Sequence, residues 1–212
     1  MSFLYVDKIT HYEEKRIIRG IKNVTRNEPF FYWLPNGRRI LSPAVVLEAM
    51  AQLGAWLQMK SGNFQHRPVL LASPRVDYFD APEAGDQIEI ECRAVDFGED
   101  VVTLDGEARV NGQLLVKSES SRGYLLPIED FDDSDRLSGR FDNLYKPEDP
   151  GVIDHGPGAT KLKAICGPSA FDSLRYIDGI IEHTPYKSVT AFKNFSSCEP
   201  FFQEHFVKRP VV

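Results

Sequence analysis

This 212-residue sequence has little cysteine, no excess of positive charge and no long uninterrupted apolar run. Its three cysteines are an odd number without a Cys-x-x-Cys pair, which argues against a disulfide framework and a cysteine-based zinc site and favours a reducing, cytoplasmic location. The formal net charge of −6 offers no basic field for a phosphate backbone, so nucleic acid is not an expected partner. The N-terminus is charged by Asp7, and Glu48 and Gln52 interrupt the longest apolar run, so we expect neither a signal peptide nor a membrane span.

The residues that are present are typical of a folded globular protein. Apolar residues make up 42% of the chain, charged residues 26% and aromatic residues 11%, which is enough to build a hydrophobic core. The length is awkward, because 212 residues exceed a typical domain of about 150 residues and fall short of two. We therefore expect one folded domain with an additional part.

The additional part is an internal repeat at a constant offset of 171 residues. Residues 5–41 and 176–212 share ten identities in 37 aligned positions without a gap. The four-residue block Glu28–Phe31 recurs as Glu199–Phe202 in the same register. The sequence therefore predicts a second copy of the opening of the first domain.

One long, enclosed helix is predicted after the first copy of this opening. Ser42 is a favourable capping residue, and Pro43 fits the first helical position, where its missing N–H costs nothing. The helical pattern continues to about Lys60 and ends before Gly62. Apolar residues cover more than one stripe of this helix, so we expect a sheet to surround it.

The sheet is predicted from four segments rich in β-branched and aromatic residues: 69–79, 87–97, 101–111 and 113–126. Alternation is clearest at Ile88, Ile90 and Cys92, and Asn111-Gly112 is a strong two-residue hairpin signal. Together with two strands in the repeated opening, these elements make up a first domain over residues 1–127.

The region after the first domain changes in composition. An acidic stretch followed by a proline- and glycine-rich stretch predicts a linker over residues 128–170, crossing the surface as a solvated tether. The second copy then occupies residues 171–212. It stops at Val212, which is equivalent to Leu41, immediately before a second helix would begin.

Two motifs carry a family resemblance. The segments Asn27–Phe31, Asn-Glu-Pro-Phe-Phe, and Leu47–Gln52, Leu-Glu-Ala-Met-Ala-Gln, resemble the FabZ/FabA family of 3-hydroxyacyl-[acyl carrier protein] dehydratases. The resemblance covers residues 3–127 and returns over residues 172–212. It implies an α+β hotdog fold, in which a curved antiparallel sheet wraps round one long helix and two such sheets join side by side. In this chain it implies a tandem, double-hotdog arrangement with an incomplete second copy.

The catalytic residues of the FabZ/FabA family are divided between the two copies. The resemblance implies a histidine shortly after the Phe-Phe pair and an acid fourteen residues further on, with each site shared by two paired hotdogs. The first copy keeps the acid as Glu48 but has Leu34 at the histidine position. The second copy has the histidine as His205, and its own acid would fall beyond Val212. We therefore expect one composite site built from His205 and Glu48.

The resemblance implies that this site converts a 3-hydroxyacyl thioester to a trans-2-enoyl thioester. His205 is expected to act as general base on the α-proton, and Glu48 as general acid on the leaving hydroxyl. Burial among the apolar residues of its helix is expected to raise the pKa of Glu48 and help keep it protonated. No metal or organic cofactor is needed. Pro43 replaces a glycine of the family whose backbone N–H would polarise the carbonyl.

Further site residues follow from the same resemblance. The expected substrate-binding residues are Phe206, Gln52 and Phe31. Aromatic residues 30–33 are candidates to line an acyl tunnel, with core packing as the favoured role. Four basic residues follow the active loop in the two copies: Arg38, Arg39, Lys208 and Arg209. They are candidates to contact an acyl carrier protein with its phosphopantetheine-linked acyl chain. The alternative is that they are solvated loop charges.

Three functions are compatible with these residues. The leading hypothesis is a dehydratase of fatty-acid or polyketide type. The alternatives are a non-catalytic hotdog scaffold or acyl-binding module of a larger synthase, and a hotdog thioesterase. We expect the remainder of the second hotdog, or another hotdog chain, to complete the pair.

Overall fold

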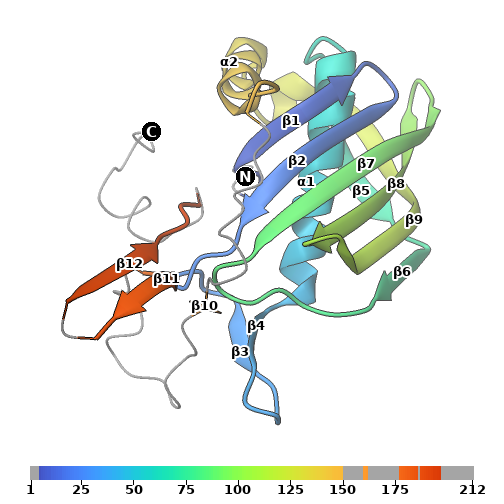
Figure 1. The fold of residues 1–212 in the computed structure, drawn as a ribbon. Coiled ribbons are helices and arrows are strands. Elements are labelled where there is room, and N and C mark those ends of the chain that lie inside the picture. Colours follow the sequence, from blue (N-terminus) through green and yellow to red (C-terminus); the bar gives the residue numbers. More distant parts are fainter. Residues whose placement is uncertain (1–4, 150–159, 162–176, 186, 197–212) are drawn as a thin grey trace.

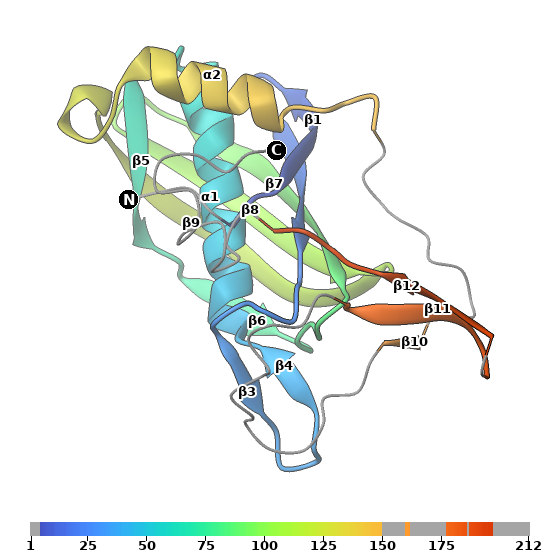
Figure 2. The ribbon, with the colours of Figure 1, turned by 90° about the vertical axis from the view of Figure 1, so that its left-hand side faces the viewer.

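The computed structural model describes residues 5–149, 160–161, 177–185 and 187–196. A single long helix, α1 (Pro43–Ser61), lies in the concave face of a seven-stranded antiparallel sheet (Figures 1 and 2). The strand order is β1-β2-β7-β8-β9-β5, and β6 also pairs with β9. The strands are β1 (Lys8–Glu13), β2 (Ile17–Asn23), β5 (His66–Ala72), β6 (Arg75–Tyr78), β7 (Gln87–Phe97), β8 (Val101–Val110) and β9 (Gln113–Pro127). This is the α+β hotdog fold.

Helix α1 is enclosed, as its apolar pattern predicts. Thirteen of its nineteen residues are buried, and Leu53, Trp56 and Leu57 are fully so. The helix begins at Pro43, but the expected side-chain cap from Ser42 is wrong, because the Ser42 hydroxyl makes no capping hydrogen bond. Backbone contacts hold the start instead, since the Ser42 N–H donates to the carbonyl of Phe30.

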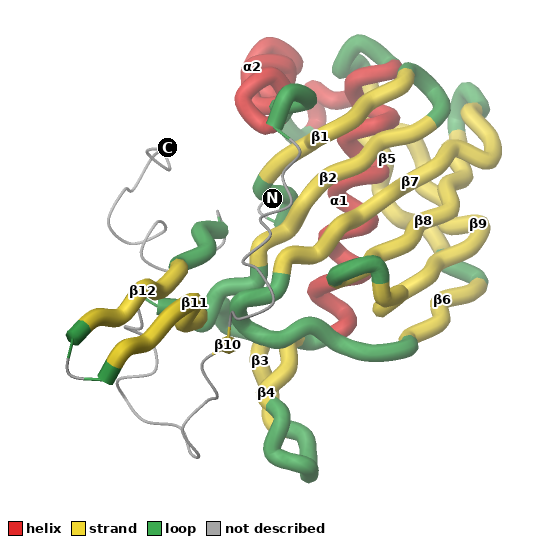
Figure 3. Tube along the Cα trace, in the orientation of Figure 1, coloured by secondary structure: helices red, strands yellow, loops and turns green. Residues whose placement is uncertain are grey.

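The sheet differs from the prediction in two places. The segment 69–79 is not one strand but two, β5 and β6, which separate at Ser73 and Pro74. Four strands rather than two precede α1, since β3 (Phe31–Trp33) and β4 (Arg39–Leu41) form a small hairpin that projects from the body (Figure 3). The hairpin at Asn111 and Gly112 is confirmed, with φ of 50° and 77° at these residues.

The expected linker is wrong at its start, because the chain after β9 folds back onto the core. A short 3-10 helix (Ile128–Asp130) leads to α2 (Ser134–Leu144), whose first turn is capped by the Asp133 side chain. Its Phe141 is buried against the rings of Tyr12 and Trp56, at centroid distances of 5.7 and 6.1 Å. Acidic residues favour a helix N-terminus, so this stretch starts a helix rather than a tether. Of the rest of the expected linker, the structure describes residues 145–149 and β10 (Thr160–Lys161).

A second hairpin reproduces the first in register. Strands β11 (Gly179–Thr184) and β12 (Ser188–Phe192) pair antiparallel, and β10 joins the edge of β11. The pairing Lys8–Ile21 in β1–β2 becomes Gly179–Phe192 in β11–β12, at the 171-residue offset of the sequence repeat. The irregularity between Ile9 and His11 also recurs, between Ile180 and Glu182.

Candidate functional site

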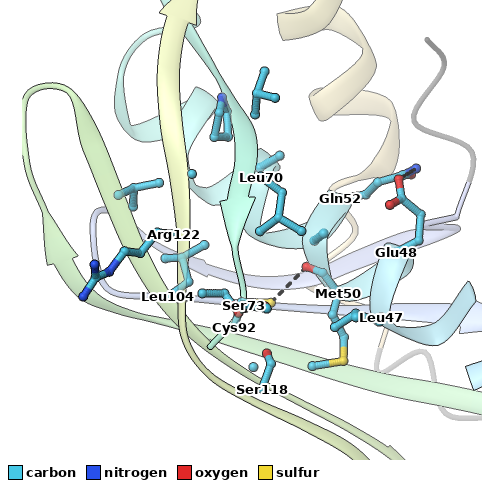
Figure 4. A pocket seen from close by; sticks show the side chains of 18 of the residues that line it. Leu47, Glu48, Met50, Gln52, Leu70, Ser73, Cys92, Leu104, Ser118 and Arg122 are labelled. Atoms are coloured by element: carbon cyan, nitrogen blue, oxygen red, sulfur yellow. Dashed lines mark hydrogen bonds between the residues drawn. The ribbon is translucent and has the colours of Figure 1, made fainter. Parts of the chain in front are cut away.

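The main cavity of the described chain lies between α1 and the strands β5, β7, β8 and β9 (Figure 4). Its volume is about 400 Å³, within the range of small-ligand pockets. One face of α1 forms a wall, with residues spaced three and four apart: Leu47, Glu48, Ala51, Gln52 and Ala55. The sheet supplies apolar residues opposite: Val69, Leu70, Val102 and Leu104. Such a lining suits an aliphatic chain with a polar group at the Glu48 end.

Glu48 is held in place by the residue one turn further along α1. The Gln52 side-chain amide donates a hydrogen bond of 2.8 Å to Glu48 Oε1. The Gln52 carbonyl oxygen accepts a hydrogen bond of 3.0 Å from the Tyr5 backbone N–H, which fixes the amide with its NH2 group toward Glu48. Within the described residues, no hydrogen bond engages the second oxygen, Glu48 Oε2. This oxygen is therefore available to a ligand.

The expected burial of Glu48 is wrong for this chain, because its side chain is exposed. Val46 and Met50 are buried, yet they do not surround Glu48. Residues two apart in a helix point about 200° away from each other, so Val46 and Met50 point into the core while Glu48 lies at the solvent-exposed rim of the cavity. Only a surface added from outside could bury this carboxyl.

The β3–β4 hairpin carries the residue that replaces the family histidine. Leu34 lies in its turn, donating its N–H to the Arg38 carbonyl and accepting from the N–H of Gly37. The aromatic side chains of Phe30, Tyr32 and Trp33 are 38–49% exposed, so the prediction that they pack in the core is wrong. Neither they nor Phe31 line the main cavity as the described residues form it.

The two arginines of this hairpin have partners within the chain. Arg38 donates to Glu83 at 2.8 Å and to Asp80 at 3.2 Å, and these contacts, the Glu83 hydrogen bond first, raise its pKa. The Arg39 guanidinium lies 4.5 Å from the centre of the Phe31 ring. Arg38 therefore ties the hairpin to the turn that contains Glu83.

The structure thus brings together Glu48 and Gln52 among the predicted residues. Phe31, Arg38 and Arg39 lie on the hairpin. The predicted residues of the second copy lie outside the described residues: His205, Phe206, Lys208 and Arg209.

Sequence reasoning missed the sheet residues that shape the cavity floor. The Cys92 thiol donates to the carbonyl of Met50 at 3.3 Å, and burial raises its pKa to about 12, so it is a packing group rather than a nucleophile. A Cβ at Gly106 would lie 2.8 Å from Met50 Cε and 3.0 Å from Ser118 Oγ, which shows how closely α1 approaches the sheet here. The alternation through Ile90 and Cys92 was the available signal, because it places both on the inner face.

Residues 1–119 match the family model described as a FabA-like domain, which covers more than half of the chain. The chain belongs to the FabA-like family. This FabA-like chain is 32% identical over 126 residues to the 3-hydroxyacyl-[acyl-carrier-protein] dehydratase FabZ of Oleidesulfovibrio alaskensis, covering 58% of the chain and 82% of that relative. It is 33% identical over 120 residues to the FabZ of Proteus mirabilis, covering 55% of the chain and 80% of the relative.

Solved structures similar to the FabA-like chain show lower identity. The protein smu.793 of Streptococcus mutans, bound to acetyl CoA, aligns with a TM-score of 0.46 at 14% identity, covering 57% of this chain and 88% of that one. The PaaI protein of E. coli aligns with a TM-score of 0.44 at 12% identity, covering 55% and 81%.

No described helix is both long and apolar enough to span a membrane. No group of three or more histidine, cysteine, aspartate or glutamate side chains in the described residues is arranged to hold a metal ion.

Proposed function

We propose that this chain dehydrates 3-hydroxyacyl-[acyl carrier protein] thioesters to trans-2-enoyl thioesters, in fatty-acid or polyketide-type synthesis. The observation that carries the proposal is the place of Glu48, on the wall of an apolar cavity, oriented by Gln52 and with Oε2 available. The FabZ relatives named above bear the name of this activity, and Glu48 lies within residues 1–119, which match the FabA-like domain.

The proposed reaction needs a base and an acid on one substrate. The imidazole of His205 takes the α-proton, and the electron pair of that C–H bond forms the new double bond between the α and β carbons. The bond from the β carbon to the hydroxyl breaks, and Glu48 supplies the proton with which the hydroxyl leaves as water. His205 and Glu48 then exchange the proton through solvent, which returns both to their starting states.

The exposure of Glu48 supports a site shared between two hotdogs. Strand β5 is the last strand of its sheet, and its Val69, Leu70 and Leu71 are 41–65% exposed. Adjacent residues of a strand point to opposite faces of the sheet, so β5 exposes apolar side chains on both faces at this edge. A second hotdog joined here would cover the edge and exclude water from the nearby Glu48.

The carrier protein is proposed to approach from the basic residues that follow the active loops. Arg38 contributes little, because Glu83 and Asp80 already neutralise it. The contact is therefore assigned to Arg39 together with Lys208 and Arg209, and it would present the pantetheine-linked acyl chain to the cavity.

The test is to incubate the full chain with a 3-hydroxyacyl carrier protein and to follow the acyl group by mass spectrometry. An enoyl product supports the proposal, because the loss of one water makes the acyl group about 18 Da lighter. Release of a free acid would instead indicate a thioesterase, and an unchanged acyl group a scaffold or acyl-binding module.

Two variants assign the roles in that assay. Glu48→Gln and His205→Ala are each expected to lower the rate by about 100-fold or more, the usual loss for a general acid or base. Glu99→Gln is the matched control, because Glu99 is an exposed carboxylate in the β7–β8 turn. Full activity in Glu48→Gln or His205→Ala would refute the composite site.

A further inference from the structure

The end of the cavity remote from Glu48 is closed by a contact between two side chains. The guanidinium of Arg67, on β5, lies 5.3 Å from the centre of the Phe131 ring. Both residues line the cavity. A flat guanidinium packs closely on an aromatic face, and its charge is attracted to the ring. We name this contact the end pair (Arg67 and Phe131).

The position of the end pair follows from the path of the chain. Helix α1 carries Glu48 near its start, and only the turn of residues 62–65 separates the end of the helix from β5. Strand β5 runs back along α1, so its first residues lie beside the C-terminal part of the helix. Figure 2 shows α2 crossing this same end of α1, where Lys60 Nζ lies 4.9 Å from the centre of the Phe141 ring. Glu48 and the end pair therefore mark opposite ends of the cavity.

Phe131 is held in place from both sides along the chain. The Ile128 N–H donates to the carbonyl of Gln65 at 2.9 Å, and the Ile128 carbonyl accepts from the Phe131 N–H at 2.9 Å. On the other side, the Asp132 carboxylate accepts a hydrogen bond of 2.7 Å from Arg136 Nε, in the first turn of α2. These bonds fix the backbone that carries the ring, although the residue is 42% exposed.

The closing ring belongs to a part of the chain outside the family match. The match to the FabA-like domain ends at residue 119, whereas Phe131 lies between the 3-10 helix and α2. The helix wall with Glu48 lies inside the match. The segment that folds back after β9 therefore adds a closure to a cavity whose helix wall belongs to the matched domain.

The distance between the two ends sets the length of the chain that fits. Glu48 and Ala55, both on the helix wall, are seven residues apart, which is about 10 Å along α1. An extended aliphatic chain, whose C–C bonds advance about 1.25 Å each along its axis, covers this distance with about eight carbon atoms. The path between the ends is lined by apolar side chains: Ala51, Leu70 and Leu104.

We propose that Phe131 determines acyl-chain length, because its ring, packed on Arg67, stops the tail of the chain at about eight carbon atoms beyond the reacting atoms. The ligand class is a linear aliphatic acyl chain of medium length. The inference rests on the proposed function for the identity of the ligand and for the position of its reacting atoms at Glu48. Its test measures binding rather than turnover, so the two proposals can fail separately.

The test is isothermal titration calorimetry of the full chain with S-decyl-pantetheine and S-tetradecyl-pantetheine, thioethers that bind without reacting. Each methylene that becomes buried strengthens binding, so a cavity with an open end would favour the tetradecyl probe. The end pair predicts that the parent protein favours the decyl probe instead. Phe131→Ala removes the ring and is expected to raise the affinity for the tetradecyl probe, relative to the decyl probe, by about tenfold or more.

Two further variants make the outcome decisive. Phe131→Trp should weaken binding of the decyl probe, because a larger ring shortens the cavity. Phe79→Ala is the matched control and should keep the preference of the parent, because Phe79 is exposed and does not line the cavity as the described residues form it.

A parent protein that favours the tetradecyl probe, or the same preference in the parent and in Phe131→Ala, would overturn the inference. Failure of both probes to bind would overturn it as well. The expected preference in a chain that does not dehydrate its substrate would support Phe131 as the stop and refute only the proposed function.

Discussion

Gln52 and Glu48 form a fixed pair, because the Gln52 amide is bound at both ends: its oxygen by the Tyr5 N–H and its NH2 group by Glu48 Oε1. Gln52 was expected to bind substrate. In the structure, the Gln52 amide instead orients the Glu48 carboxyl at the cavity. A residue that orients a catalytic group affects the rate of the reaction more than the affinity for substrate.

We therefore expect Gln52→Leu to lower kcat of dehydration by about tenfold with little change in KM. Leucine keeps the apolar contacts of this buried position and removes both hydrogen bonds. Steady-state kinetics on the 3-hydroxyacyl carrier protein provide the measurement. Gln65→Leu, at an exposed glutamine after α1, serves as the control and should match the parent. A change in KM alone would indicate that Gln52 binds substrate rather than orients Glu48.

Helix α2 should contribute strongly to stability through Phe141, which is surrounded by the rings of Tyr12, Trp56, Phe64 and Tyr145. Phe141→Ala is expected to lower the free energy of unfolding by ~3–5 kcal/mol, the usual cost of deleting a buried aromatic ring. Urea unfolding followed by tryptophan fluorescence reports the loss.

The control for α2 is Phe79→Ala, because Phe79 is 60% exposed. Its expected cost is below ~1 kcal/mol. If Phe141→Ala costs no more than Phe79→Ala, α2 does not belong to the folded unit and residues 128–144 behave as the tether that the acidic sequence predicts.

Cys92 should resist alkylation in the folded protein. Its pKa of about 12 leaves almost no thiolate at pH 8, and the side chain is buried under α1. Treatment with iodoacetamide at pH 8, followed by peptide mass mapping, should find Cys92 unmodified before unfolding and modified in guanidinium. Rapid labelling of Cys92 in the folded state would mean that α1 separates readily from β7.

Acid should weaken the contact between β2 and β7 at Glu91. Burial opposes ionisation of Glu91, but hydrogen bonds from Arg19 at 2.6 Å and Arg93 at 2.7 Å prevail and lower its pKa below 4.5. A lowered folded-state pKa contributes stability that is present above the unfolded value and is lost as the pH falls through the folded value.

Glu91→Gln is therefore expected to be less stable than the parent at pH 7, by under ~1 kcal/mol because the group is partly exposed, with the difference shrinking as the pH falls below 4.5 and through the lowered folded-state pKa. Urea midpoints at several pH values provide the measurement, and Glu99→Gln again serves as the control. A difference that persists undiminished in acid would show that packing, rather than charge, is the cause.

The sequence predicted the parts of the fold that local patterns determine. Pro43 marks the start of α1, the alternation at Ile88 and Ile90 marks the inner face of β7, and Asn111-Gly112 marks the turn to β9. Strands β11 and β12 pair at the 171-residue offset from β1 and β2, whereas the second copy as a whole stays a prediction. These features depend on neighbours in the chain.

The features that the sequence did not predict depend on tertiary contacts. Leu137, Phe141 and Leu144 form a helical stripe, yet the surrounding acidic residues suggested a tether, because charge was weighed above spacing. Glu48 was expected to be buried because helix α1 as a whole is enclosed. The sheet covers some faces of α1 and leaves the face with Glu48 exposed. Which face of α1 is left open is decided by where β5 ends the sheet.

The pairing of β5 also determines the order in which the hotdog assembles. Strands β7, β8 and β9 follow one another through short turns and pair as they emerge, whereas β5 must wait for β9, the last strand of the domain. Late pairing between distant segments is slow, so the apolar run Val69-Leu70-Leu71 stays unpaired longest on the growing chain. This strand is therefore the last of the sheet to find its partner as the domain folds.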